Sequence, residues 1–203
     1  KIGSEILRRF ALTEISPDGF WGEHNHLLPT TGYNYLTLSA VALYWEHSKD
    51  PAVLPALKKA TNFHKYFTYP DGTPVEVIND RNRYWEVNPW GNFGFSHFPE
   101  GRRYAQFLAG FFKPEDMKPE KLGRIAQDAL YYHEGPLRPI PQDIKSYYYK
   151  MSIDAGIRKN KPWVVAYSGL IATQAVNNTF FLDRQGNLSI FHEKLGLIIT
   201  GAN

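Results

Sequence analysis

The chain has 203 residues, of which 43% are hydrophobic, 15% aromatic and 21% charged, which is the composition of a folded protein and not of a disordered one. Because cysteine is absent, disulfides, thiolate chemistry and cysteine-based zinc sites are excluded. The net charge of +3 is compatible with an acidic partner. The sequence has no basic run interleaved with aromatics, which is typical of nucleic-acid-binding proteins. It also has no apolar stretch of the roughly 20 residues that are needed to span a membrane.

Helical periodicity dominates the first half of the chain. Residues 4–12 have the pattern of a helix that is already under way where the sequence starts, and apolar residues recur at three and four positions in later segments. These segments predict helices over residues 35–47, 52–69, 101–112 and 118–132. Residues 35–47 are apolar almost all round, which is typical of an inner helix.

Two similar turns interrupt these helices. Pro17-Asp18-Gly19 and Pro70-Asp71-Gly72 lie about 50 residues apart, and each follows a predicted helix. A helix pair that recurs at such an interval is typical of an α/α toroid or solenoid. The sequence therefore predicts a repeated helical architecture for residues 1–134.

The pattern changes after a Pro-rich segment, residues 135–145, which we interpret as an interdomain linker because neither a helix nor a central strand accommodates so many prolines. Strand-like segments follow at residues 147–153, 163–167, 179–182, 188–191 and 197–199. We therefore expect an antiparallel β-sandwich to begin within residues 146–203. The predicted fold class is α+β and multidomain, with both domains incomplete, as in a piece of a longer polypeptide.

A first polar cluster follows the first turn, in the sequence Trp21-Gly22-Glu23-His24-Asn25-His26. His24 and His26 with Glu23 are one possible metal site, because His-x-His places two imidazoles on one side of an extended strand. Asn25 and His26 as polar contacts to a substrate are a second interpretation. A loop cluster without function is a third.

A second polar cluster follows the second turn. It offers a carboxylate, two guanidinium groups and a phenol within a short span: Glu76, Arg81, Arg83 and Tyr84. A salt-bridged surface connection would have the same composition, so this cluster alone leaves both interpretations open.

Together the two clusters resemble the α/α-toroid polysaccharide lyases, namely the alginate lyases and the heparinase II/III-like enzymes. In those families an Asn, often beside a His, occupies a toroid loop, and a Tyr lies further on, in a stretch of the form Asp-Gly-x-x-x-Glu followed by Arg and Tyr. Here Asn25-His26 and the stretch from Asp71 to Tyr84 have this order. A complete toroid needs many more helices than this sequence supplies.

The resemblance implies β-elimination on a uronic-acid-containing glycan, without a metal or an organic cofactor. Its catalytic residues would be Asn25, His26, Tyr84 and Arg83. Its substrate-binding residues would be Arg81, Glu76, His97, Tyr33, Trp21 and Arg102. The expected partner is an acidic polysaccharide or oligosaccharide, with no nucleic acid and no membrane, and the expected location is periplasmic or extracellular.

Two other classes of function stay open at this point. A toroid glycoside hydrolase of the unsaturated uronyl hydrolase type would need paired carboxylates, for which Glu76 with Asp80 or Glu23 are candidates. A non-catalytic glycan-binding protein would use its aromatic residues for stacking.

Overall fold

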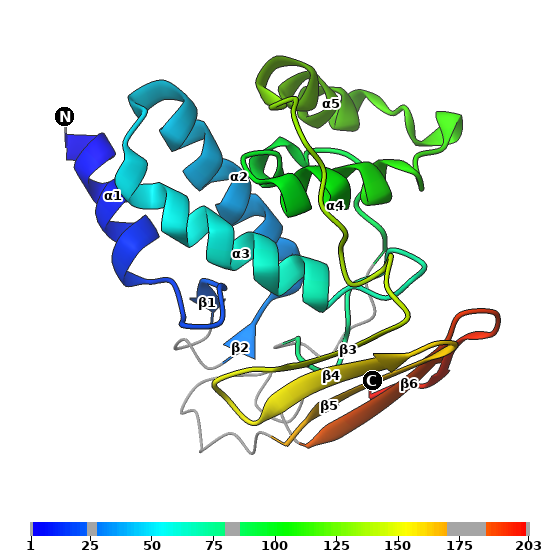
Figure 1. Ribbon diagram of the computed structural model, residues 1–203. Coiled ribbons are helices and arrows are strands. Elements are labelled where there is room, and N and C mark those ends of the chain that lie inside the picture. The colour runs from blue at the N-terminus through cyan, green and yellow to red at the C-terminus, as the bar shows by residue number, and fades with distance from the viewer. Residues whose placement is uncertain (1, 24–27, 80–85, 170–185, 202–203) are drawn as a thin grey trace.

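The computed structural model describes residues 2–23, 28–79, 86–169 and 186–201. Within these residues it contains five α-helices and one five-stranded antiparallel sheet, so the α+β class predicted from the sequence is confirmed. The helices form the upper part of the molecule and the sheet lies beneath them (Figure 1). None of the described helices is long and apolar enough to cross a membrane.

The helices follow one another closely along the first two thirds of the chain. Their bounds are α1 (Ile2–Thr13), α2 (Thr31–Ser48), α3 (Leu54–Tyr66), α4 (Pro99–Ala109) and α5 (Pro119–Tyr131), with short 3-10 turns η1 (Pro51–Val53), η2 (Phe93–Phe95) and η3 (Pro114–Asp116). Proline occupies the first turn of α3, α4 and α5, where it costs no helical hydrogen bond. Consecutive helices from α1 to α4 contact one another. We group them as two helical pairs, α1 with α2 and α3 with α4.

The two Pro-Asp-Gly turns have the same structure. Gly19 and Gly72 both adopt positive φ angles, of 95° and 84°, which glycine adopts without strain. Each glycine N–H donates to the carbonyl three residues earlier, Ser16 in the first turn and Tyr69 in the second. An isolated antiparallel bridge closes each turn. The same turn thus follows both α1 and α3.

The sheet has the strand order β3-β4-β5-β6-β7, so each strand pairs with its neighbour in sequence. The bounds are β3 (Ser146–Lys150), β4 (Ala155–Asn160), β5 (Trp163–Ser168), β6 (Asn187–His192) and β7 (Gly196–Ile199). Strand β4 was not expected from the sequence, and the expected strand at 179–182 lies outside the described residues. Two-residue strands β1 (Gly22–Glu23) and β2 (Leu28–Pro29) pair separately.

Two apolar cores hold the molecule together. The first lies among the helices and includes Leu38, Leu57 and Tyr104. The second core is shared between the helical half and the sheet, because side chains from α3 and from the second Pro-Asp-Gly turn pack against one face of the sheet. Its buried members include Phe63, Phe67, Tyr69, Val77, Ile157, Val164, Ala166 and Phe191.

The segment between α5 and β3 runs along α4 before it enters the sheet (Figure 1). The Arg102 Nε–H donates to the carbonyl of Pro136, at 2.9 Å, and Ile140 is buried in the helical core. Further on, the ammonium of Lys159 on β4 donates to the carbonyls of Pro141 and Gln142. The Pro-rich segment is therefore fastened at both ends to the structure around it.

Candidate functional site

Two adjoining cavities, each of about 590 Å³, open beside the N-terminal end of α2, the segment 86–90 and α5. They share Glu86, Val87, Trp90 and Lys121 in their linings, and we call them together the α5 groove. The first cavity also includes Tyr33, Leu36 and Arg124, and the second includes Lys113, Lys118 and Glu120.

Basic side chains outnumber acidic ones in the described lining of the α5 groove. The cations are Lys113, Lys118, Lys121 and Arg124, and the carboxylates are Glu86 and Glu120. Lys121 and Arg124 lie one helical turn apart on α5, so both project toward the same side. Such a lining suits a ligand that carries several carboxylates.

Aromatic rings also face the first cavity. Tyr33, in the first turn of α2, has 44% of its surface exposed. Trp90 is largely buried, and the Nζ of Lys121 lies 5.5 Å from the centroid of its ring. The indole N–H of Trp90 is buried and has no hydrogen-bond partner among the described residues.

The catalytic residues expected from the sequence all lie outside the described residues. Asn25 and His26 belong to residues 24–27, as does His24, and Arg81, Arg83 and Tyr84 belong to residues 80–85, as does Asp80. One described residue from beyond each segment lines the first cavity. Tyr33 follows the first segment on α2, and Glu86 directly follows the second.

Of the expected substrate-binding residues that are described, Tyr33 lines the groove. Trp21 does not, because it is buried in the helical core, where its backbone N–H donates to the side-chain oxygen of Asn34 at 3.0 Å. Arg102 is also buried, and its guanidinium donates to the carbonyls of Ser96 and Pro136. These two residues make structural contacts and do not reach the groove.

Glu76 is fully buried between the second Pro-Asp-Gly turn and the sheet. Its carboxylate accepts hydrogen bonds from the hydroxyls of Tyr69, at 2.9 Å, and Thr200, at 3.3 Å. Burial raises the pKa of Glu76, although these hydrogen bonds act in the opposite direction. Glu76 therefore belongs to the joint between the helices and the sheet, and not to the groove.

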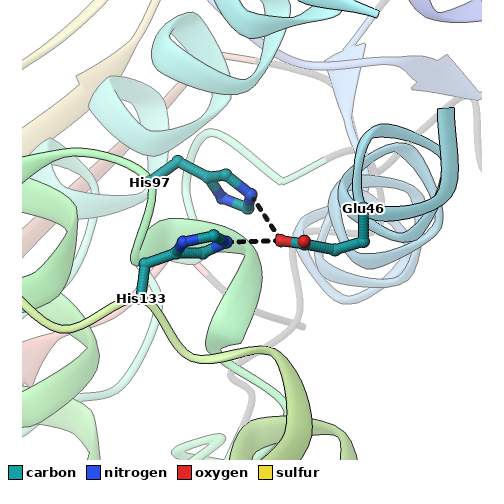
Figure 2. A group of neighbouring side chains, drawn as sticks. All are labelled: Glu46, His97 and His133. Atoms are coloured by element: carbon teal, nitrogen blue, oxygen red, sulfur yellow. Dashed lines mark hydrogen bonds and ion pairs between the residues drawn. The ribbon is translucent and has the colours of Figure 1, made fainter. Parts of the chain in front are cut away.

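His97 lies in a different cluster, with Glu46 and His133 (Figure 2). The Oε1 atom of Glu46 lies 3.1 Å from Nε2 of His97 and 2.5 Å from Nε2 of His133. Glu46 comes from the last turns of α2, His97 from the junction of η2 and α4, and His133 from the segment after α5. No local motif joins three residues so far apart in sequence, and the sequence singles out only His97.

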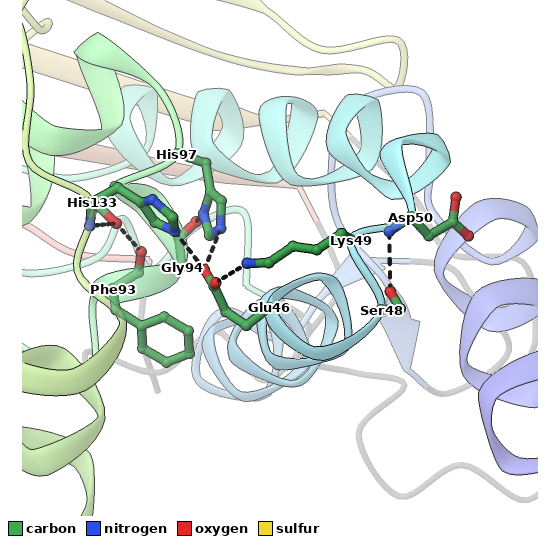
Figure 3. A network of polar contacts seen from close by, with 9 residues as sticks. Glu46, Ser48, Lys49, Asp50, Phe93, Gly94, His97 and His133 are labelled. Carbon is green, nitrogen blue, oxygen red and sulfur yellow. Dashed lines mark hydrogen bonds and ion pairs between the residues drawn. The ribbon is translucent and has the colours of Figure 1, made fainter.

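The surroundings of this cluster fix its charges (Figure 3). The ammonium of Lys49 donates to the second carboxylate oxygen of Glu46, at 2.7 Å. Burial alone would raise the pKa of Glu46, but the hydrogen bonds from Lys49 and His133 hold it below its usual value, so Glu46 is a carboxylate. Burial lowers the pKa of His97, so its imidazole is favoured in the neutral form.

Comparison of the chain with models of known families and with curated proteins gave no match, and comparison of its fold with solved structures gave none.

Proposed function

We propose that this protein cleaves a uronic-acid-containing polysaccharide by β-elimination in the α5 groove. The observation that carries the proposal is the groove itself, whose described lining holds four basic and two acidic side chains. An acidic polymer needs cations along its path and rings that stack on sugar faces. Lys121, Arg124 and Tyr33 supply these groups.

The chemistry follows from the resemblance to α/α-toroid lyases. Asn25 and His26 would contact the uronate carboxylate and stabilise the enolate that forms when the C5 proton leaves. The Tyr84 phenolate, favoured by the neighbouring Arg83, would accept this proton. As the C4–O bond breaks and a C4–C5 double bond forms, the resulting Tyr84 phenol would return the proton to the leaving oxygen. This sequence of steps balances without a metal or a redox cofactor.

The architecture is compatible with the same proposal. We interpret the two helical pairs, each with its Pro-Asp-Gly turn, as consecutive units of an α/α toroid. The five-stranded sheet would then be one layer of a β-sandwich. A polysaccharide substrate favours a periplasmic or extracellular location.

Hydrolysis is the main alternative, and one observation favours it: two carboxylates, Glu86 and Glu120, line the α5 groove. A hydrolase requires such a pair at a separation of roughly 5–10 Å. The pair considered from the sequence has less support, because Glu76 is buried away from the groove.

The deciding experiment is a screen of the protein against a panel of uronate polysaccharides, which follows ultraviolet absorbance and new reducing ends in parallel. β-Elimination produces both signals in equal amounts, because each cleavage creates one unsaturated end. Reducing ends without absorbance would indicate hydrolysis, and Glu86→Gln or Glu120→Gln would then abolish them. Binding without either signal would indicate a non-catalytic glycan-binding protein.

Variants test the roles within the proposed site. Tyr84→Phe should lower turnover by about 10⁴-fold while polymer binding survives, because one residue serves as both base and acid. Lys121→Gln should instead raise KM by about 10-fold, as expected when one charged contact worth about 1.4 kcal/mol is lost. Lys194→Gln, in the turn between β6 and β7, is the control and should change neither value. Near-normal turnover of folded Tyr84→Phe would refute its role.

A further inference from the structure

We propose that Glu46, His97 and His133 bind a divalent transition-metal ion of the zinc class. Each residue offers one ligand atom, and the three ligand atoms all lie within 4.8 Å of one another (Figure 2). Two imidazole nitrogens and one carboxylate oxygen form a frequent protein ligand set for zinc. This proposal does not depend on the proposed lyase activity.

The hydrogen bonding of His97 provides the strongest argument. Its Nδ1 lies 3.0 Å from the carbonyl oxygen of Gly94, which can only accept, so Nδ1 carries the proton (Figure 3). In the neutral imidazole, Nε2 then has a lone pair, and this lone pair faces the Glu46 carboxylate oxygen 3.1 Å away. Two electron-rich atoms at this separation need a positive charge between them.

Either a second proton on His97 or a metal ion could supply that charge. The His97 side chain is only 2% exposed, and the Glu46 side chain is 8% exposed. A metal ion binds the neutral imidazole through the same lone pair. Nε2 of His133, which donates to the same carboxylate oxygen, would release its proton on binding the ion.

Groups around the cluster hold the three ligands in place, as the outer shell of a metal site does. The carbonyl of Gly94 fixes the tautomer of His97, and Lys49 holds the second oxygen of Glu46. The ring of Trp45 packs edge-on against both imidazoles, with centroid distances of 4.8 Å to His97 and 5.5 Å to His133. These contacts reduce the freedom that the ligands would lose on binding an ion.

The side chain of His133 is 36% exposed, which leaves a path from solvent and room for a water molecule as a fourth ligand. Magnesium and calcium prefer oxygen ligands, so a site with two imidazoles should select against them.

The position of the site indicates a structural role. Glu46 and Tyr33 lie on the same helix, α2, about 20 Å apart along its axis at a rise of about 1.5 Å per residue. An ion at Glu46 would therefore lie far from the part of the groove at Tyr33. It would join α2, the start of α4 and the end of α5, and its binding energy would stabilise the folded state.

The test is a titration of the chelator-treated protein with Zn²⁺ and, separately, with Co²⁺. We expect one equivalent to stay bound after dialysis, with visible Co²⁺ absorption bands of low-symmetry coordination. At free Zn²⁺ about 100 times Kd, the melting temperature should rise by roughly 5–10 °C. Mg²⁺ at the same concentration should leave it unchanged.

Glu46→Gln and His133→Gln should each weaken Zn²⁺ binding by more than about 100-fold, beyond the 10–100-fold effect of losing an outer-shell partner. His47→Gln is the matched control, because His47 is an exposed imidazole next to Glu46 and does not belong to the cluster. No saturable binding by the wild-type protein would overturn the proposal, and so would unchanged binding by folded His133→Gln. Loss of binding in His47→Gln would assign the ion to the surface instead.

Discussion

His64 is a histidine whose surroundings allow only the neutral form. It is fully buried, and the side-chain N–H of Asn34 donates to its Nε2 at 3.0 Å, while the oxygen of Asn34 accepts from the backbone of Trp21. The rings of Tyr35, Phe63 and Phe95 surround the imidazole. Burial without a nearby carboxylate lowers the pKa of His64 from 6.5 to about 3.

This shift predicts a pH-dependent loss of stability. Above pH 6.5 His64 is neutral in the folded and the unfolded protein, so it adds no pH dependence. Below pH 6.5 the unfolded chain binds a proton that the folded protein excludes, so the free energy of unfolding falls as pH falls toward about 3. Between pH 8 and 5 the expected loss is about 2 kcal/mol.

Urea denaturation over this pH range measures the effect. His64→Gln keeps an acceptor for Asn34 and cannot take up a proton, so its free energy of unfolding should fall by about 2 kcal/mol less than that of the wild-type protein. Parallel pH curves for the two proteins would contradict the assignment.

At the scale of elements, the two Pro-Asp-Gly turns share a sequence and a backbone but not a role. In the first turn, the carboxylate of Asp18 accepts from the backbone N–H of Ser152, at 2.8 Å, and from its hydroxyl, at 2.5 Å. In the second turn, the carboxylate of Asp71 accepts from the backbone N–H and the hydroxyl of Thr73, two residues away. Asp18 thus connects the turn after α1 to the segment between β3 and β4, whereas these bonds of Asp71 stabilise its own turn.

A matched pair of variants separates the two roles. Asp18→Ala and Asp71→Ala should each lower the free energy of unfolding by about 1–3 kcal/mol, the cost of losing hydrogen bonds to a charged acceptor. Only Asp18→Ala should speed hydrogen exchange at the Ser152 amide, because this amide then loses its partner. Equal protection of Ser152 in the two variants would show that the connection to the sheet does not depend on Asp18.

The sequence predicts the helices well, because their apolar residues recur at helical spacing and their ends carry Pro or Gly. It does not predict β4, where Ala155, Gly156 and Ile157 are buried in succession and the alternation of a half-buried strand is absent. Lys159 adds to the difficulty. Lysine normally indicates a position on the surface, yet this side chain is only 1% exposed. Its ammonium donates to the backbone carbonyl of Pro141 and lies near Glu193.

The residues of the two candidate sites also differ in whether the sequence predicts them. Tyr33 could be named from its place at the start of an inner helix, but Lys121 and Arg124 could not, because two basic residues on an amphipathic helix usually indicate a solvated face. Glu46 and His133 could not be connected to His97 either, since only the packing of α2 and the segment after α5 around η2 brings them together. Local pattern identifies elements, whereas these contacts depend on tertiary structure.

At the scale of the whole molecule, the helical half and the sheet share one apolar core. Separating them would expose Phe63, Phe67 and Tyr69 on one side and Ile157, Val164 and Phe191 on the other. We therefore expect one transition in chemical denaturation, with coincident midpoints for helical circular dichroism and for a probe in the sheet.

Ile157→Ala should lower the free energy of unfolding by about 2–5 kcal/mol, as a large-to-small change in a buried site does. The common midpoint should fall accordingly. Because the core is shared, the helical signal should shift as much as the sheet signal. Leu188→Ala, at a half-exposed position of β6, is the control and should have a small effect. Two separate transitions, with only the sheet affected by Ile157→Ala, would show that the halves are independent.

The shared core also has a consequence for synthesis of the protein in the cell. The aromatic face formed by Phe63, Phe67 and Tyr69 leaves the ribosome long before the strands that cover it, since about 90 residues separate Phe67 from Ile157. At translation speeds of about 5–20 residues per second, this face stays uncovered for roughly 5–18 seconds. We therefore expect the nascent chain to expose an apolar face to which chaperones can bind until β4 and β5 have emerged.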